Sequence, residues 1–136
     1  MSAIRTLGVT ALACVLAGSV YGTAVAAMRT VNQSQITITA GKKAGIQDLY
    51  AWDKNCRALN VSFQPMPSFS GRLYTVRDRF RISGAPGEPC NGKSVSGSRV
   101  IFEPARNFKG MATVRYMVRT PNHADTFVFS RNVMVR

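Results

Sequence analysis

The chain has 136 residues with 18 Lys and Arg, 6 Asp and Glu and one His, giving a formal net charge of +12. Three cysteines and one histidine without ligand-like spacing do not predict a metal centre, and no sequence feature predicts a cofactor. The motifs G-x-S-x-G and H-E-x-x-H and a phosphate-binding glycine loop are also missing, which argues against an enzyme and assigns no catalytic residue.

The first 26 residues have the features of a secretory signal peptide. Arg5 precedes an apolar run over residues 7–20, and a small-residue tail ends in Ala24, Val25 and Ala26. A positive start, an apolar core and an A-x-A site are typical of a cleaved leader. The run is nominally long enough to stay as a membrane anchor, but glycines and polar residues dilute it. We predict cleavage near Ala26 and a single domain over residues 27–136.

Cleavage changes the cysteine count and the charge of the chain. Cys14 leaves with the leader, so Cys56 and Cys90 remain in an oxidising compartment. We predict that they form one disulfide, which closes a loop of about 35 residues. The mature chain keeps 17 basic residues against 6 acids, a net charge of +11 because Arg5 is lost. Such a charge either favours polyanionic partners or serves solubility alone.

Strand-like alternation covers most of the mature region. The expected strands lie around residues 36–39, 59–63, 73–83, 99–103, 112–119 and 127–135. The segment 83–97 is rich in Gly, Pro, Asn and Ser and predicts a long loop. A helical turn is expected, if anywhere, within residues 45–55. Short strands at this spacing predict an all-β, antiparallel sandwich.

Residues 73–83 carry the strongest charged feature of the sequence. If this strand is regular, its basic side chains project from one sheet face at two-residue steps. Such a row suits an extended polymer that carries phosphate, sulfate or carboxylate groups. The alternative is a solvated face or a charged edge that blocks aggregation between strands. The expected anion-binding residues are Arg77, Arg79 and Arg81, and the opposite, apolar face carries Tyr74, Val76, Phe80 and Ile82.

Trp52 is the most distinctive aromatic residue. It precedes Cys56 by four positions, and we expect it to pack over the disulfide. The alternative is a platform on which a ligand stacks. His123 lies in a polar loop beside Asn122 and Asp125, where no fixed partner marks it as a catalytic base.

The stretch from residue 100 to residue 116 has a recognisable layout. A strand ends at Pro104, the sequence Asn107, Phe108, Lys109 and Gly110 follows, and Tyr116 lies in the next strand. This layout resembles the bacterial immunoglobulin-like and cadherin-like β-sandwich repeats. The resemblance implies an immunoglobulin-like sandwich of about seven strands, with Phe108 closing one end and Tyr116 facing the core. Those repeats often place an acid after the glycine, whereas Met111 follows here, so cadherin-like calcium binding is not expected.

These observations predict a periplasmic or secreted β-sandwich that acts as a binding or envelope-associated module without cofactor or metal. After cleavage no membrane-spanning segment is expected, and no specific nucleic-acid motif is present. The charge favours an anionic polysaccharide or another envelope component as partner. The alternative is a small inhibitor or accessory subunit that docks on another exported protein.

Overall fold

The computed structural model describes residues 26–68 and 70–136. The predicted signal peptide therefore lies, except for Ala26, outside the described residues. The described part of the chain forms nine β-strands. Within it, no helix is long and apolar enough to cross a membrane.

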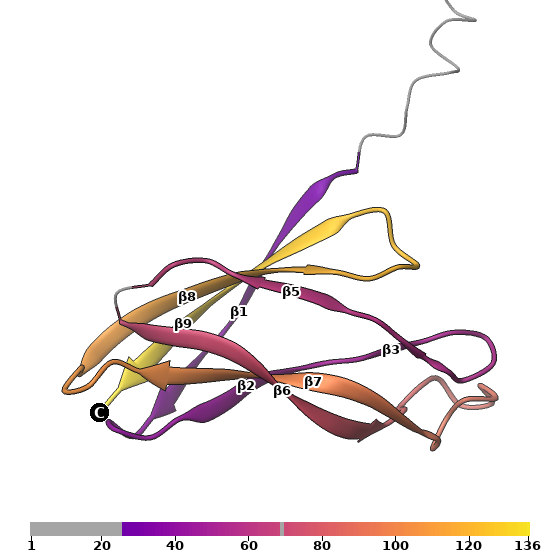
Figure 1. Cartoon of the computed structure of the whole chain (residues 1–136), viewed down its shortest axis with the longest axis horizontal. Coiled ribbons are helices and arrows are strands. Elements are labelled where there is room, and N and C mark those ends of the chain that lie inside the picture. Colours follow the sequence, from indigo (N-terminus) through magenta and orange to yellow (C-terminus); the bar gives the residue numbers. More distant parts are fainter. Residues whose placement is uncertain (1–25, 69) are drawn as a thin grey trace, which may run out of the picture.

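The strands form two main sheets and one short hairpin (Figure 1). The first sheet has the order β1 (Met28–Ile38), β9 (Thr126–Val135), β8 (Gly110–Arg119), β5 (Ser62–Pro65). The second has the order β2 (Ala44–Leu49), β7 (Ser94–Pro104), β6 (Gly71–Arg81). The hairpin consists of β3 (Ala51–Trp52) and β4 (Ala58–Leu59). β1 runs parallel to β9, and the other pairs are antiparallel.

This strand order confirms the predicted immunoglobulin-like sandwich. The chain places β2 in one sheet and β5 in the other, returns for β6 and β7, and crosses back for β8 and β9 (Figure 1). That path reproduces the arrangement of immunoglobulin domains, in which each sheet combines strands from distant parts of the chain. β1 adds a further strand beside β9, so the larger sheet has four strands.

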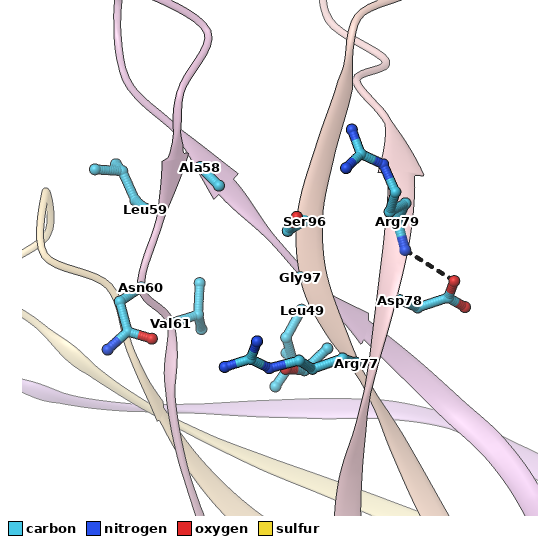
Figure 2. A pocket seen from close by; sticks show the side chains of 11 residues that line it. Leu49, Ala58, Leu59, Asn60, Val61, Arg77, Asp78, Arg79, Ser96 and Gly97 are labelled. Atoms are coloured by element: carbon cyan, nitrogen blue, oxygen red, sulfur yellow. Dashed lines mark hydrogen bonds between the residues drawn. The ribbon is translucent and has the colours of Figure 1, made fainter.

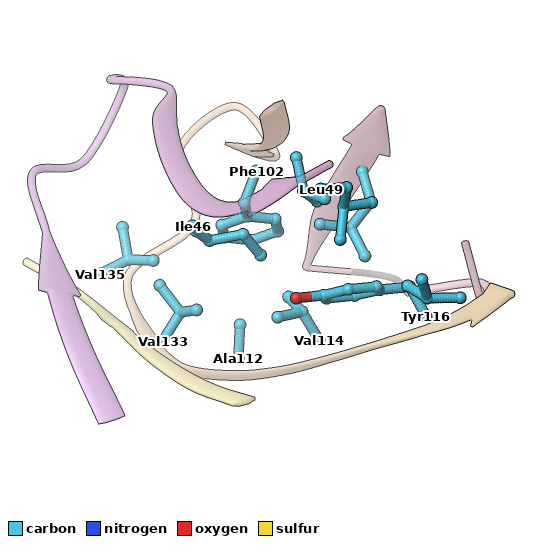
Figure 3. Close-up of a cluster of buried hydrophobic side chains, with 11 residues drawn as sticks. Ile46, Leu49, Phe102, Ala112, Val114, Tyr116, Val133 and Val135 are labelled. Atoms are coloured by element: carbon cyan, nitrogen blue, oxygen red, sulfur yellow. The ribbon is translucent and has the colours of Figure 1, made fainter. Parts of the chain in front are cut away.

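The main core lies between the two sheets and follows the predicted alternation. In β8, the buried positions are Ala112, Val114, Tyr116 and Val118, and the residues between them are exposed or half-buried. Figure 3 shows Ala112, Val114 and Tyr116 facing Ile46, Leu49 and Phe102 of the opposite sheet, and Val118 belongs to the same core cluster. Burial of one face of each sheet against the other supplies the hydrophobic stabilisation of the domain.

The buried Tyr116 hydroxyl has polar partners at the rim of the core. It contacts the side-chain oxygens of Gln33 and Gln47, and Arg131 Nε donates to the same oxygen of Gln33 at 3.2 Å. A buried phenol needs such partners because an unsatisfied hydroxyl costs free energy. Burial raises the pKa of Tyr116 to about 12, opposed by the charge of Arg131 and the hydrogen bond to Gln33.

The turn between β7 and β8 gives the Asn-Phe-x-Gly layout a physical basis. The Phe108 N–H donates to the Ala105 carbonyl at 3.0 Å, and the Phe108 ring packs against the core. Asn107 has φ 64° and Gly110 has φ 119°, two positive values within four residues. Asn and Gly adopt this region most readily, so both residue types suit this turn.

Two expectations about segment boundaries are wrong. Residues 45–55 contain no helical turn, because β2 pairs with β7 and β3 pairs with β4. The long loop ends at Lys93 rather than at Gly97, since residues 94–97 pair with residues 78–81 of β6. Small residues of low strand propensity are held in the sheet by this pairing.

The segment 59–63 is also not one strand. Leu59 belongs to β4 and pairs with Ala51, whereas Phe63 belongs to β5 and pairs with Val118 of the larger sheet. The chain therefore passes from the hairpin to the four-stranded sheet over Asn60 and Val61.

Candidate functional site

The three arginines of β6 project from one face of a regular strand. β6 pairs with β7 without interruption from Gly71 to Arg81, so side chains two residues apart share a face. Arg77, Arg79 and Arg81 are all exposed; we call them the arginine face. The residues directly across from them on β7 are Ser98, Ser96 and Ser94.

The arginine face is an extension of the inner face of its sheet. Leu73 has an odd residue number, as the three arginines do, and therefore lies on the same face of β6. It belongs to the main core and is 9% exposed. Beyond Thr75 the side chains on this face are exposed, and arginine replaces the apolar residues. The opposite face becomes buried instead, because Phe80 and Ile82 are 7% and 1% exposed. Val76, expected on that apolar face, is an exception because it is 41% exposed.

A cleft of about 620 Å³ lies beside the arginine face. Residues 77–79 of β6 and residues 96–98 of β7 line one side of the cleft, residues 58–61 line the other, and Leu49 lies between them. Figure 2 shows the Arg77 side chain extending from β6 toward Asn60 and Val61, while the Asp78 carboxylate points away. No aromatic side chain is found among the described residues that line the cleft.

Four of the six acidic residues form ion pairs with arginines outside the arginine face. Arg29 pairs with Asp125 at 2.6 Å, and Arg72 pairs with Glu103 at 2.7 Å. In residues 26–68 and 70–136, no carboxylate lies within ion-pair distance of the arginine face. Its internal side-chain partner is a hydroxyl, because Arg79 Nε donates to Ser94 Oγ at 3.4 Å. The face therefore keeps its positive charge.

Arg99 shows the contrast on the other face of the same sheet. It pairs with Asp48 at 2.8 Å and with Asp78 at 3.3 Å. The hydrogen bond to Asp48 and the charge of that carboxylate raise the pKa of Arg99. The sequence did not single out this cluster, because its residues come from three strands and no local spacing relates them.

The predicted disulfide is formed, and it lies on the side of β6 opposite the arginine face. Cys56 and Cys90 are joined with a Cα–Cα distance of 5.3 Å. The half-buried Trp52 packs against the small cluster formed by Ile82, Cys90 and Val95. Tyr50 stacks between Trp52 at 6.0 Å and Phe80 at 4.9 Å, measured between ring centroids. Trp52 therefore packs near the disulfide, and a ligand platform at this residue stays a prediction.

Trp52 and the arginine face do not form one site. Trp52 lines a separate recess of about 250 Å³ with Tyr50 and His123, whereas the arginines line the larger cleft. The His123 ring contacts Phe127 edge-on, with 5.7 Å between ring centroids. Across the described ranges, no cluster of His, Cys, Asp and Glu is arranged to hold a metal ion.

The hairpin that carries Cys56 is held by one carboxylate. Asp53 Oδ1 accepts the N–H groups of Asn55 and Arg57, both at 2.9 Å, and Cys56 itself has φ 62°. An Asp side chain that accepts backbone donors in this way is a common turn former. Because β4 follows directly, the hairpin and the disulfide position the cleft side formed by residues 58–61.

Comparisons with known proteins yield distant similarities. No protein-family model matches the chain, and no curated protein matches it significantly. Among solved structures it is similar to amebosin, with 18% identity and a TM-score of 0.44 over 81% of this chain and 98% of that one. It is similar to the CupB6 tip adhesin of Pseudomonas aeruginosa, with 9% identity and a TM-score of 0.36 over 81% and 41%. A cysteine protease inhibitor of Entamoeba histolytica has 13% identity and a TM-score of 0.33 over 81% and 96%. Likenesses this distant assign neither a family nor an activity, so the function is argued from the site.

Proposed function

We propose that this chain is a non-enzymatic binding module that holds an extended anionic polymer along the arginine face. The observation that carries the proposal is the row of three exposed guanidinium groups at a two-residue period beside an open cleft. That period corresponds to about 7 Å along a strand. A polymer with anionic groups at a comparable spacing contacts all three arginines at once.

Electrostatics favour an external anion at this face. Three like charges on neighbouring positions of one face repel each other, and no carboxylate of the described residues forms an ion pair with them. A bound anion removes this repulsion and accepts charge-assisted hydrogen bonds from the guanidinium groups. The serine hydroxyls across the strand pair add further donors.

The proposed location is the periplasm or the outside of the cell. The leader pattern of residues 1–26 and the disulfide between Cys56 and Cys90 both support export, because disulfides persist in oxidising compartments. The resemblance to bacterial immunoglobulin-like repeats supports an envelope-associated role in the same way.

The test compares two triple variants with equal loss of charge. In the first, Arg77, Arg79 and Arg81 are changed to Gln. In the control, Arg106, Arg115 and Arg119 are changed to Gln; these residues are exposed and lie outside the arginine face. Retention of the purified domain on immobilised polyglutamate and on a sulfated polysaccharide is measured at increasing salt concentration.

We expect the first variant to lose at least tenfold in affinity while the control loses much less. Thermal stability should change little in either, because exposed charges contribute little to folding. Equal losses would show that diffuse net charge, and not a site, attracts the polymer. Unchanged retention of the first variant would leave the arginines as edge protection. A salt-resistant, stoichiometric complex with one exported protein would favour the inhibitor or accessory-subunit alternative.

A further inference from the structure

The arginine face lies on a strand with an unpaired backbone edge. β6 is the last strand of its sheet, and β7 is its neighbour on one side. In the described structure, no other strand pairs with the opposite side of β6. Because β6 is 11 residues long, this edge offers a long row of N–H and C=O groups to a further strand.

The backbone groups at this edge belong to the arginines themselves. In an antiparallel pair, successive residues point their N–H and C=O groups alternately toward and away from the neighbouring strand. Ile82 directs its N–H to the carbonyl of Lys93, next to β7, at 2.7 Å. The Arg79 N–H instead donates to the side chain of its neighbour Asp78, at 2.8 Å. The backbone N–H and C=O groups of the odd-numbered residues of β6 therefore point toward the free edge.

From this arrangement we infer that β6 binds an extended acidic peptide as an added antiparallel strand. The peptide carries Asp or Glu at alternate positions, opposite Arg77, Arg79 and Arg81. This inference rests on the proposed function and names the partner of the same site. Backbone hydrogen bonds at the edge supply affinity, and cross-strand pairs of opposite charge supply specificity.

The period of the arginine face is the main argument for a peptide strand. Side chains of any β-strand recur on one face every two residues, so an added strand matches the arginines in register without distortion. The part of the cleft lining that the structure describes also has none of the aromatic side chains on which nucleic-acid bases stack. A polysaccharide contacts the guanidinium groups but leaves the row of backbone donors and acceptors unpaired.

The same features disfavour pairing of β6 with a second copy of itself. Antiparallel self-pairing brings arginines of the two copies onto one face of the joint ladder, and like charges across strands are destabilising. In the free protein, Asp78 accepts a hydrogen bond from the Arg79 N–H, which makes this group less available for pairing with another strand. An incoming carbonyl group replaces this contact, while Asp78 keeps its ion pair with Arg99.

The experiment uses synthetic peptides and the folded domain. One peptide alternates Thr and Glu over nine residues, and a second has the same composition with its Glu residues in one block. Two further peptides have the alternating sequence with N-methyl groups on all Glu amides or on all Thr amides. In the proposed register, the Glu amides face β6 and the Thr amides face away. Affinities are measured at low salt for the wild-type domain and for the triple Gln variant of the arginine face.

We expect the alternating peptide to bind at least tenfold more tightly than the block peptide. Methylation of the Glu amides should abolish this advantage, whereas methylation of the Thr amides should preserve it. Amide hydrogen exchange of Arg77 and Arg79 should slow when the alternating peptide is bound. If the block and alternating peptides bind equally, or if the two methylations have equal effects, the inference that the peptide binds as an added strand is wrong.

Failure of this inference is distinguishable from failure of the proposed function. If the triple Gln variant loses polyanion retention but the peptides show no strand pattern, the face binds polymers through side chains alone. A sulfated polysaccharide that outcompetes the alternating peptide at the arginine face would likewise overturn the assignment to a peptide. If the triple Gln variant retains polyanions as the wild type does, both proposals are wrong.

Discussion

Removal of the disulfide is expected to lower the stability of the domain substantially. In the loop-entropy model, a bridge over 34 positions contributes about 4 kcal/mol to the free energy of unfolding. For a domain of about 110 residues this corresponds to a fall in Tm of about 12–24 °C. The variant Cys56→Ala with Cys90→Ala is preferred over Ser, because Cys90 is 4% exposed and lies among apolar side chains. A serine hydroxyl there would add a desolvation cost of its own.

The assay is thermal unfolding followed by circular dichroism, with the chemically reduced wild type as a control for the side-chain change. Hydrogen exchange adds a local readout. We expect faster exchange around Ile82 and Val95, which pack against the disulfide, than around Val114 and Val133 in the main core. A Tm within about 3 °C of the wild type would refute the reasoning, since it would mean that the bridge adds little constraint to the unfolded chain.

Three further predictions address the leader, the sheet and the core. The intact mass of exported protein should correspond to residues 27–136, and a species that retains residues 7–20 would contradict export by cleavage. Gly97→Ala places a Cβ 2.6 Å from the Leu49 carbonyl oxygen and 2.8 Å from Tyr50 Cβ. Urea denaturation should show that the free energy of unfolding falls by about 1–3 kcal/mol. A midpoint equal to that of the wild type would show that the backbone shifts without loss of stability. Because the pKa of Tyr116 is raised from 10.0 to about 12, its contribution to stability is present below pH 10 and lost as the pH rises through 12. Tyr116→Phe should show a shallower decline than the wild type over this range, and identical declines would contradict the buried phenol.

The main sandwich was predictable because its strands bury one face each. In β8, every second residue from Ala112 to Val118 is buried, and the alternation in sequence expresses this directly. The Asn-Phe-x-Gly turn was recognisable for a related reason, since its positive φ values restrict the residue types that fit. A local sequence pattern is therefore enough to predict the structure where local geometry restricts which residue types fit.

The architecture around the arginine face was less predictable, because it depends on distant segments. The alternation in β6 correctly places Leu73 and Phe80 on opposite faces of the strand. It does not show that each of the two faces is buried at one end of the strand. That change of side arises because Tyr50 stacks on Phe80, beside the segment held by the disulfide. The cleft opposite Arg77 likewise depends on residues 58–61, which no local pattern relates to β6.

The pairing of β1 with β9 has a consequence for the time course of folding. Ala27 and Asp125, at one end of this parallel pair, are joined by a hydrogen bond although they are 98 positions apart. β9 also separates β1 from β8, so β1 has no neighbour in its sheet until β9 is in place. A chain that emerges gradually therefore leaves Ile36 and Ile38 of β1, which pack against the main core, without their neighbouring strand until residues 126–135 arrive. Closing such a distant contact is slow, and exposed strand edges promote aggregation in the meantime.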